Sequence, residues 1–286
     1  MRHGIHRIGQ RVVMIVALSL LGGLVSATLV RFAPGYGIDE RELDSRLNHA
    51  SLEAIRNSHR LNKNLLSYYR NYLWGAAHGN FGTSEWLQRP ISSLVRERFP
   101  VTARSVLIGV LLAWATALAA SLAGVFFRGL FVDISGTIVS GLLIAIPAAV
   151  IAMLTVYLRA PVCLAIALVT FPKLFRYLRN LLTHTYDHPY ILAARARGIR
   201  QARIIFRHVL PSVAPSLFAL LGVSLSMAFG AAIPIEALCD SPGIGQLAWQ
   251  AALNRDLPLI MNLTLLVTII TVATNSFANV SNERAL

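Results

Sequence analysis

The stretch YILAARARGIRQARIIFRHVLPS, residues 190–212, holds five arginines, one histidine and no acidic residue. Strongly apolar segments lie on both sides of it. Three kinds of partner bind such a basic stretch: nucleic acid, an anionic lipid surface, or another protein. The remainder of the chain decides among these partners, and with them the fold.

The composition of the chain is typical of a membrane protein. Of its 286 residues, 55% are hydrophobic and only 14% are charged, compared with about 25% charged residues in soluble domains. The formal net charge of +13 at pH 7 would by itself suggest nucleic acid or an anionic membrane surface as a partner. The two cysteines, Cys163 and Cys239, are too few for a disulfide framework.

Several apolar stretches are long enough to cross a bilayer, which takes about 20 mainly apolar residues. A shorter candidate, Ala160–Pro172, has only 13 residues, and the basic residues Lys173, Arg176 and Arg179 follow it. The five long stretches without Asp, Glu, Lys or Arg are Val12–Val30, Ser105–Phe127, Ile134–Leu158, Val209–Ile235 and Leu257–Asn282.

Charge asymmetry favours counting the short candidate as a span. Residues 173–207 hold eight Lys and Arg against one acid, Asp187, and the positive-inside rule places such a stretch in the cytoplasm. That placement requires the short segment to cross, as a helix that continues to about Leu178. We therefore predict an all-α membrane protein with six transmembrane helices and both termini cytoplasmic, so that residues 31–104 and 236–256 lie outside.

The first apolar stretch has an alternative interpretation as a cleaved signal peptide, because VSA at residues 25–27 resembles a cleavage site. Its uncharged run of 19 residues exceeds the roughly 7–15 of a signal core, which favours an uncleaved helix. We predict a single transmembrane domain over residues 1–286, with an extracytoplasmic segment 31–104 and a cytoplasmic loop 183–211. Within the extracytoplasmic segment, apolar spacing predicts an amphipathic helix through Leu61, Leu65, Tyr68, Tyr69 and Tyr72.

No catalytic or energy-supplying motif occurs in the sequence. There is no phosphate-binding loop of the form G-x-x-x-x-G-K-[ST], and no acid in the middle of an uncharged span, where an ion-coupled carrier usually needs one. His184, Asp187 and His188 could suggest a metal site, but we interpret them as a helix entry with Pro189 at its first position and Asp187 as its cap. We predict no metal, no cofactor bound by this chain and no nucleotide hydrolysis. Three classes of function remain: a channel, a membrane enzyme, or one subunit of a complex in which another subunit supplies the energy.

The basic stretch divides at Gly198. After it, Ala202, Ile205, Phe206 and Val209 have the spacing of one apolar helix face, with arginines on another face. Before it, the segment from Pro189 reads as a second short helix, and glycine permits a sharp turn between the two. Two short helices joined in this way can project a knuckle into a groove of a partner protein. A basic helix lying on lipid is the alternative, although it needs no glycine break.

The spacing of this stretch resembles the cytoplasmic signature of bacterial ABC importer permeases, which reads E-A-A, three residues, G, nine residues, I-x-L-P. Ala193-Ala194, Gly198 and Leu210-Pro211 stand at those spacings, whereas Leu192 replaces the Glu and His208 replaces the Ile.

Other stretches resemble the dipeptide, oligopeptide and nickel permeases, in particular their B-type subunits. They are RFAPG at residues 31–35, HGNFGTSEWLQRPISSLVRERFPVTARSVLIGVLLA at 78–113, and IEALCDSPGIGQLAWQAALNRDLPLIMN at 235–262. The chain departs from this pattern in its short connection at Arg159–Pro161 and in its C-terminal NVSNERAL, which lacks a basic tail. The extracytoplasmic loop residues singled out by the resemblance are Pro242, Gly243, Gly245, Arg255 and Asp256.

The resemblance implies the type I ABC importer permease fold and an importer of the bacterial plasma membrane. It implies a second homologous permease, two cytoplasmic ATPase subunits that use ATP-Mg, an extracytoplasmic substrate-binding protein, and contact with lipid but not with nucleic acid. The knuckle would then be the ATPase-coupling loop. The residues implied in coupling are Ala193, Ala194, Arg195, Arg197, Gly198, Arg200, Leu210 and Pro211.

Two questions stay open at this level. The last apolar stretch carries a polar stripe, which either lines the translocation path or binds helices together. The solute is also undecided between a dipeptide, an oligopeptide, nickel and another small solute. The main alternative function is a self-sufficient channel or facilitator whose basic loop anchors it to lipid. The stripe consists of Thr264, Thr268, Thr271 and Asn275.

Overall fold

The computed structural model describes residues 17, 21, 22, 24, 25, 28, 70, 72, 74–76, 78–127 and 130–283, with the backbone alone at 127, 130–133 and 277–283. Most of the predicted first span lies outside these residues, as does the end of the chain after Glu283. Of the five residues whose spacing predicts the amphipathic helix, only Tyr72 is described. The six described positions between 17 and 28 are helical.

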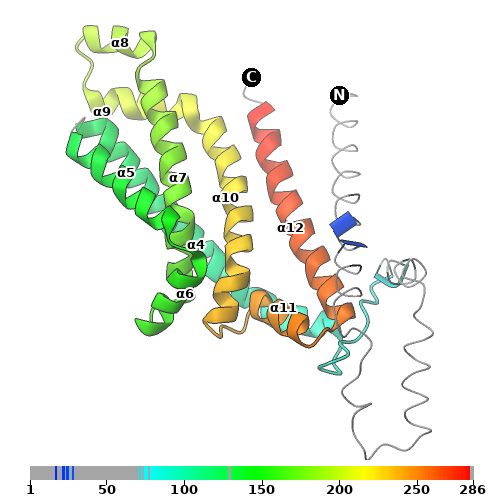
Figure 1. Ribbon diagram of the computed structural model, residues 1–286. Helices are drawn as coiled ribbons and strands as arrows, with labels where there is room; N and C mark the ends of the chain where they lie inside the picture. Colours follow the sequence, from blue (N-terminus) through cyan, green and yellow to red (C-terminus); the bar gives the residue numbers. More distant parts are fainter. Residues whose placement is uncertain are drawn as a thin grey trace, which may run out of the picture. The chain divides into compact units, whose positions relative to one another are not determined.

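The described part of the chain is helical apart from loops and one isolated β-bridge between Thr83 and Pro90 (Figure 1). The all-α prediction is therefore confirmed for these residues. In chain order the elements are α4 (Ile91–Phe127), α5 (Leu130–Ala145), α6 (Ala148–Tyr157), α7 (Val162–Tyr186), α8 (Pro189–Ala196), α9 (Gln201–Ile204), the π-helix η2 (Ile205–Val209), α10 (Leu210–Leu238), α11 (Ile244–Leu253) and α12 (Leu257–Glu283).

Within the described residues, three helical stretches are long and apolar enough to cross a membrane, namely Ile91–Phe126, Gln201–Leu238 and Leu257–Ser276. A fourth is possible if α5 and α6 count as one span. The prediction of one continuous helix over Ile134–Leu158 is wrong, because α5 and α6 meet at a bend of 96°. Pro147 explains the break: proline has no N–H to donate, and it disfavours helical backbone in the residue before it.

The short apolar segment at residues 160–172 is the first half of a 25-residue helix, α7, which runs eight residues beyond the predicted end at Leu178. This helix is amphipathic in its second half. Lys173 and Arg176 are exposed, whereas apolar side chains between them and beyond are buried. The connection from α6 is as short as expected, and Arg159 adopts the left-handed conformation within it, with φ 51°. The buried apolar residues of this half are Leu174, Phe175, Leu178 and Leu182.

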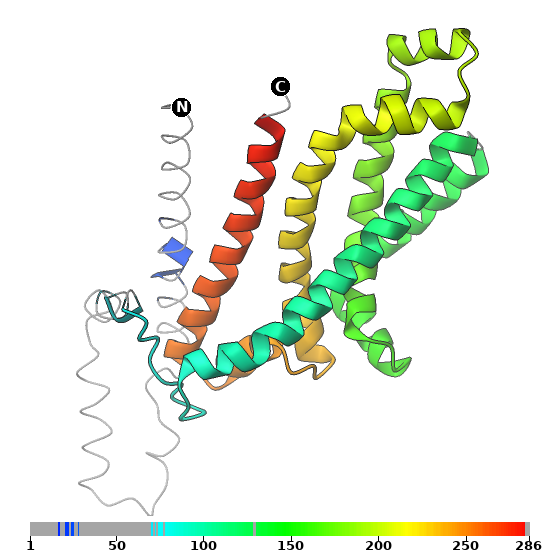
Figure 2. The same ribbon diagram turned by 180° about the vertical axis from the view of Figure 1, so that it is seen from behind.

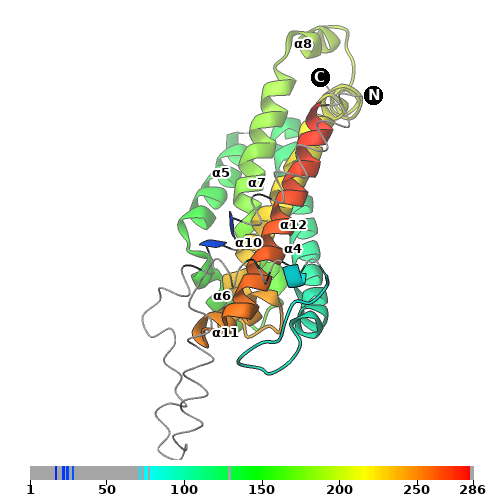
Figure 3. The same cartoon turned by 90° about the vertical axis from the view of Figure 1, so that its right-hand side faces the viewer.

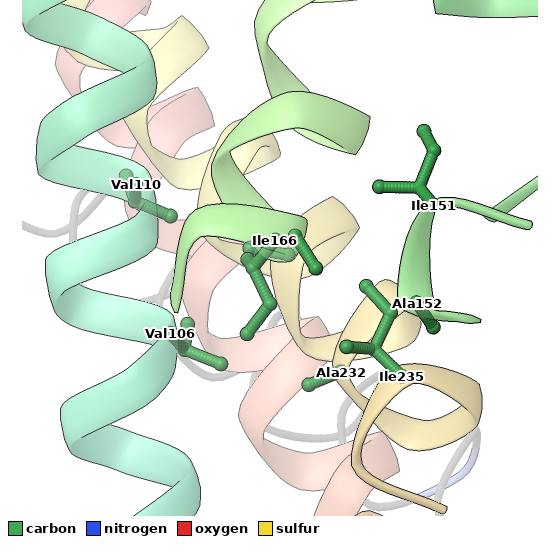
Figure 4. Packing of buried hydrophobic residues seen from close by; sticks show 9 residues of the cluster. Val106, Val110, Ile151, Ala152, Ile166, Ala232 and Ile235 are labelled. Carbon is green, nitrogen blue, oxygen red and sulfur yellow. The ribbon is translucent and has the colours of Figure 1, made fainter. Parts of the chain in front are cut away.

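The chain divides into two compact units, one made of Met1–Glu97 with Ala248–Ile269 and the other of Arg98–Leu247 with Ile270–Leu286. In the second unit, α4, α6, α7 and α10 pack around a cluster of small and branched side chains (Figure 4). Gly109 of α4 sits directly on α7, where a β-carbon would come within 2.9 Å of the Cys163 carbonyl oxygen and of Ile166. Such close approach through small residues is how helices associate in membranes. The cluster consists of Val106, Val110, Ile151, Ala152, Ala165, Ile166, Ala228, Ala232 and Ile235.

A second cluster in the same unit lies at the opposite end of α7. It joins the C-terminal part of α4 and the end of α7 to α8, α9, η2 and the start of α10. This cluster therefore fixes the basic loop to the helices from which it projects. Its buried members are Val125, Leu182, Tyr186, Ile191, Ile204, Ile205, Val209 and Val213.

Candidate functional site

The basic loop has the helix–glycine–helix form expected from its sequence. The helix α8 lies beyond the C-terminal end of α7 (Figure 1 and Figure 3), and Gly198 separates it from α9 with a φ of +74°. Two hydrogen bonds close the end of α8: Gly198 N–H donates to the Arg195 carbonyl over 2.8 Å, and Ile199 N–H donates to the Ala194 carbonyl over 3.3 Å. This pair of bonds is the Schellman motif, which ends helices with a left-handed residue, usually glycine.

The segment after Gly198, formed by α9 and η2, differs from the prediction. Ile204, Ile205 and Val209 are buried, whereas Ala202 and Phe206 are exposed, so the apolar face predicted through Ala202 and Phe206 is wrong. For the residues after Ile204 the cause is η2, because a π-helix bonds each residue to the fifth one along instead of the fourth. A π-helix has more residues per turn than an α-helix, so Val209 lies on the same face of the helix as Ile204 and Ile205.

The start of α8 also differs in detail. Pro189 occupies its first turn as predicted, but the residue before the helix is His188, and no side chain caps the helix. Asp187 instead ends α7, and the prediction that it caps the next helix is wrong. The rings of His184 and His188 meet edge to face at 5.2 Å between centroids. No group of three or more metal-binding side chains occurs among the described residues.

The outward surface of the loop is both apolar and basic. Leu192 and Tyr190 of α8 are about half exposed, and Phe206 is 62% exposed. Several residues around them are also exposed. They are Ala193, Arg197, Gly198, Arg200, Arg203, Arg207 and, at the start of α10, Pro211. Ala194 and Leu210 are half-buried against the second cluster. This mixture suits a protein groove with an apolar floor and an acidic rim better than bulk water.

Arg195 points the other way. Its guanidinium lies over the ring of Tyr186, the last residue of α7, with 3.9 Å between the Cζ atom and the ring centroid. Its Nε and Nη2 atoms are buried and have no hydrogen-bond partner among the described residues. A cation over an aromatic face is attracted by the ring quadrupole, more strongly when water is excluded. Arg195 therefore holds α8 onto α7 through the ring of Tyr186, and two of its three guanidinium nitrogen atoms are buried.

Sequence reasoning did not single out Gln201, the first residue of α9. Its side-chain amide donates to the carbonyl oxygens of Val125 and Phe126 at the end of α4, over 3.2 and 2.7 Å. These two residues lie about 75 positions earlier in the chain, and no local pattern links them to Gln201. The end of α4 lies beside the segment formed by α9 and η2 (Figure 2).

A different arrangement surrounds the residues predicted in the extracytoplasmic loop. Glu236, near the end of α10, is fully buried, and its carboxylate accepts hydrogen bonds from the Thr102 hydroxyl at 2.9 Å and from Gly245 N–H at 2.8 Å. Thr102 in turn accepts a bond from Ile244 N–H at 2.8 Å. The two glycines fit closely around this group: a β-carbon on Gly243 would overlap the Glu236 carboxylate, and one on Gly245 would lie 2.6 Å from Cα of Ile233.

The loop that contains these glycines is partly helical, a feature that the sequence reasoning missed. The helix α11 starts directly after Gly243, while Pro242 stays exposed. Gln246 of this helix accepts a hydrogen bond from Arg98 over 3.0 Å and donates one to Asp240. The loop is therefore fixed to α4 and to the end of α10 by buried polar groups.

Arg255 and Asp256 lie in the first unit, directly before the start of α12 at Leu257. Arg255 has a φ of 53°, and Asp256 is buried, with its carboxylate accepting from Leu259 N–H at 3.1 Å. That bond is an N-terminal cap of α12. The same carboxylate accepts hydrogen bonds from the Ser84 hydroxyl and from Trp86 N–H. Asp256 thus joins the helix start to the turn at residues 84–87.

The predicted polar stripe of α12 divides between two neighbours. The Thr268 hydroxyl donates to the Thr264 carbonyl in its own helix and lies 3.3 Å from the position of a β-carbon on Gly22. In the second unit, the Ser226 hydroxyl of α10 lies 3.2 Å from the Thr271 carbonyl oxygen, 2.8 Å from the Thr274 hydroxyl and 3.1 Å from Oδ1 of Asn275. Asn275 and Thr271 thus take part in a contact between helices.

Comparison with known proteins places these features in context. Residues 105–284, more than half of the chain, match the family described as "Binding-protein-dependent transport system inner membrane component". The oligopeptide transport system permease protein OppB of Salmonella typhimurium is 28% identical over 266 residues, which cover 85% of each chain. The permease protein AppB of Bacillus subtilis, also of an oligopeptide transport system, is 24% identical over 301 residues and 95% of each chain. A putative peptide permease protein of Brucella suis is 25% identical over 299 residues, covering 93% of this chain and 92% of its own length.

Proposed function

Because the chain belongs to the family of binding-protein-dependent transport system inner membrane components, we propose that it forms, with a second homologous permease, the passage of an ATP-driven peptide importer. It is a permease subunit of a binding-protein-dependent ABC importer, and its family is not catalytic. Its place is the inner membrane, which it crosses more than once. The proposal adds the pairing with a second permease, peptide as the transported solute, and the loop of this chain through which ATP hydrolysis acts.

The loop of residues 183–211 is the docking site for the ATPase subunits in this proposal. The observation that carries it is the short helix α8, ended by Gly198 and fixed against the ends of α4 and α7. A rigid projection with an apolar tip and exposed arginines fits a groove on a folded partner. A loop that only anchors the chain to lipid would work as one continuous basic helix. ATP-Mg is then bound and hydrolysed by the partners and not by this chain.

The six-helix topology with both termini in the cytoplasm is part of the same proposal. It places the basic loop inside with the ATPases and the glycine-rich loop around α11 outside with the binding protein. The supporting observations are the excess of Lys and Arg in residues 173–207 and the length of α7, which carries the chain from Val162 to the loop. Peptide as the solute is supported by the names of the three relatives.

Site-directed cross-linking tests the proposed docking. In a chain with Cys163 and Cys239 replaced by serine, a cysteine at the exposed Ala193 is coupled to a short cross-linker in membranes that also contain the co-expressed ATPase subunits of the transporter. We expect a cross-linked product with an ATPase from Ala193→Cys but not from Ser92→Cys, an equally exposed position on α4 that the proposal places outside. Cross-linking from Ser92→Cys alone would contradict the proposal.

A further inference from the structure

The side chain of Gln201 joins the basic loop to a helix that is distant in the sequence. The helix α4 ends at Phe127, and the last four carbonyl groups of any α-helix have no partner within the helix. No basic residue lies in the last turn of α4 to satisfy them. The Gln201 amide reaches two of these carbonyls, those of Val125 and Phe126.

The chemistry of this contact fixes its direction. Both neighbours are carbonyl oxygens, which only accept hydrogen bonds, so the amide nitrogen of Gln201 must face them and its two protons are both used. A carboxylate in the same place would repel the carbonyls, whereas a cationic side chain would be favoured by the negative end of the helix dipole. The contact therefore depends on a donor and not on the shape of the side chain.

Gln201 also stands at the pivot of the loop. It is the first residue of α9, three positions after Gly198, and it is followed by Ile204 and Ile205, which are buried in the second cluster together with Val125. The segment beyond the glycine is thus joined to α4 by apolar packing and by two hydrogen bonds. The segment before the glycine is held to α7 by Arg195 and Tyr186.

We propose that Gln201 is a positioning residue that transmits movement of the ATPase-docked loop to α4, by capping the C-terminal carbonyls of that helix. This inference rests on the proposed function, because it needs an ATPase bound to the loop. When the loop moves with the ATPases, the cap makes α4 follow. Without the cap, the loop moves independently of α4, and hydrolysis of ATP no longer drives the solute across the membrane.

The test uses the full transporter in proteoliposomes and measures both ATP hydrolysis and peptide uptake. Gln201→Met keeps the length of the side chain but has no donor, whereas Gln201→Lys keeps a donor. We expect Gln201→Met to retain the bound ATPases and their hydrolysis but to lower uptake per ATP by roughly an order of magnitude, because the two hydrogen bonds that join the loop to α4 are lost. Gln201→Lys should restore that ratio to near the value of the unaltered chain.

A second pair keeps the test decisive if the methionine variant does not insert. Gln201→Glu and Gln201→Lys are both long and charged, and only the lysine can cap α4, so the inference requires a low ratio for Glu and a near-normal one for Lys. Equal ratios for donor and non-donor variants would overturn the inference while leaving the docking proposal intact. Failure of the ATPases to bind the unaltered chain would overturn the proposed function itself.

Discussion

Gly243 leaves room for the carboxylate of Glu236, which occupies the space that a β-carbon at Gly243 would need. Gly245, two residues on, donates its N–H to that carboxylate and packs against the backbone of α10. The Pro-Gly-Ile-Gly sequence is therefore explained by packing: the loop must pass so close to a buried acid that only glycine fits at both positions.

Replacing Gly243 by alanine should destabilise the protein. The new methyl group must displace Glu236, and overpacking of this kind costs about 1–3 kcal/mol. The matched control is Gly230→Ala in α10, where a β-carbon meets no atom within 4 Å among the described residues and alanine is the better helix former. Thermal unfolding of the purified variants in detergent measures both, and an equal midpoint for the two variants would contradict the packing described here.

Replacing Asp256 by alanine should loosen the start of α12. The change removes a helix cap, which stabilises proteins by about 0.5–2 kcal/mol, and it leaves Ser84 and Trp86 N–H without their acceptor. Limited proteolysis of the segment around residues 84–90 should become faster than in the unaltered chain. The neighbouring Asn254→Ala is the control, since the Asn254 side chain is exposed and within the described residues its amide donates to the Gln250 carbonyl, four positions back. Equal rates for the two variants would refute the role given to Asp256.

The two interpretations of the α12 stripe make different predictions for Ser226→Ala. If Ser226 and Asn275 bind α10 to α12, the variant should lose stability by about 0.6 kcal/mol, the mean for hydrogen bonds between membrane helices. Uptake measured at a temperature well below unfolding should then stay unchanged. A normal unfolding midpoint combined with altered uptake or altered solute preference would instead favour a place in the path for this part of the stripe.

Labelling from outside the cell tests the topology. In the chain without native cysteines, a cysteine at the exposed Asn80 should react with a membrane-impermeant maleimide in intact cells, whereas one at Arg203 should react only after the membrane is opened. The reason is the positive-inside placement of the basic loop. Reaction of both positions in intact cells would rule out the six-helix topology.

Sequence reasoning recovered the helices where long apolar runs dictate them, and it located the glycine turn of the basic loop from spacing alone. It missed the bend at Pro147, although the proline was visible. The uncharged run of residues 134–158 is long enough for a span, and its length alone does not reveal a bend. It also missed α11, since the glycines before it and in its first turn, with acidic residues on both sides, suggested a loop.

The contacts within the candidate site were less predictable. Gln201 meets α4, Glu236 meets Thr102 and Asp256 meets Ser84 across more than 70 residues of sequence in each case. A local pattern carries no information on such pairs. The contact of Arg195 with Tyr186 was missed for the same reason, because an arginine within a basic stretch is not distinguished from its neighbours until the structure places the Tyr186 ring beneath it.

The function proposed for the basic loop depends on the turn at Gly198, and a pair of substitutions at this glycine examines that dependence. A side chain at Gly198 meets open space within the described chain, so only its backbone conformation, with φ +74°, opposes substitution. Asparagine tolerates that conformation, whereas valine, which is branched at its β-carbon, does not. We expect Gly198→Val to insert normally but to lose both co-purification of the ATPase subunits and uptake, and Gly198→Asn to retain both. Wild-type ATPase binding and uptake in Gly198→Val would contradict this dependence, and the basic loop would then be a lipid anchor.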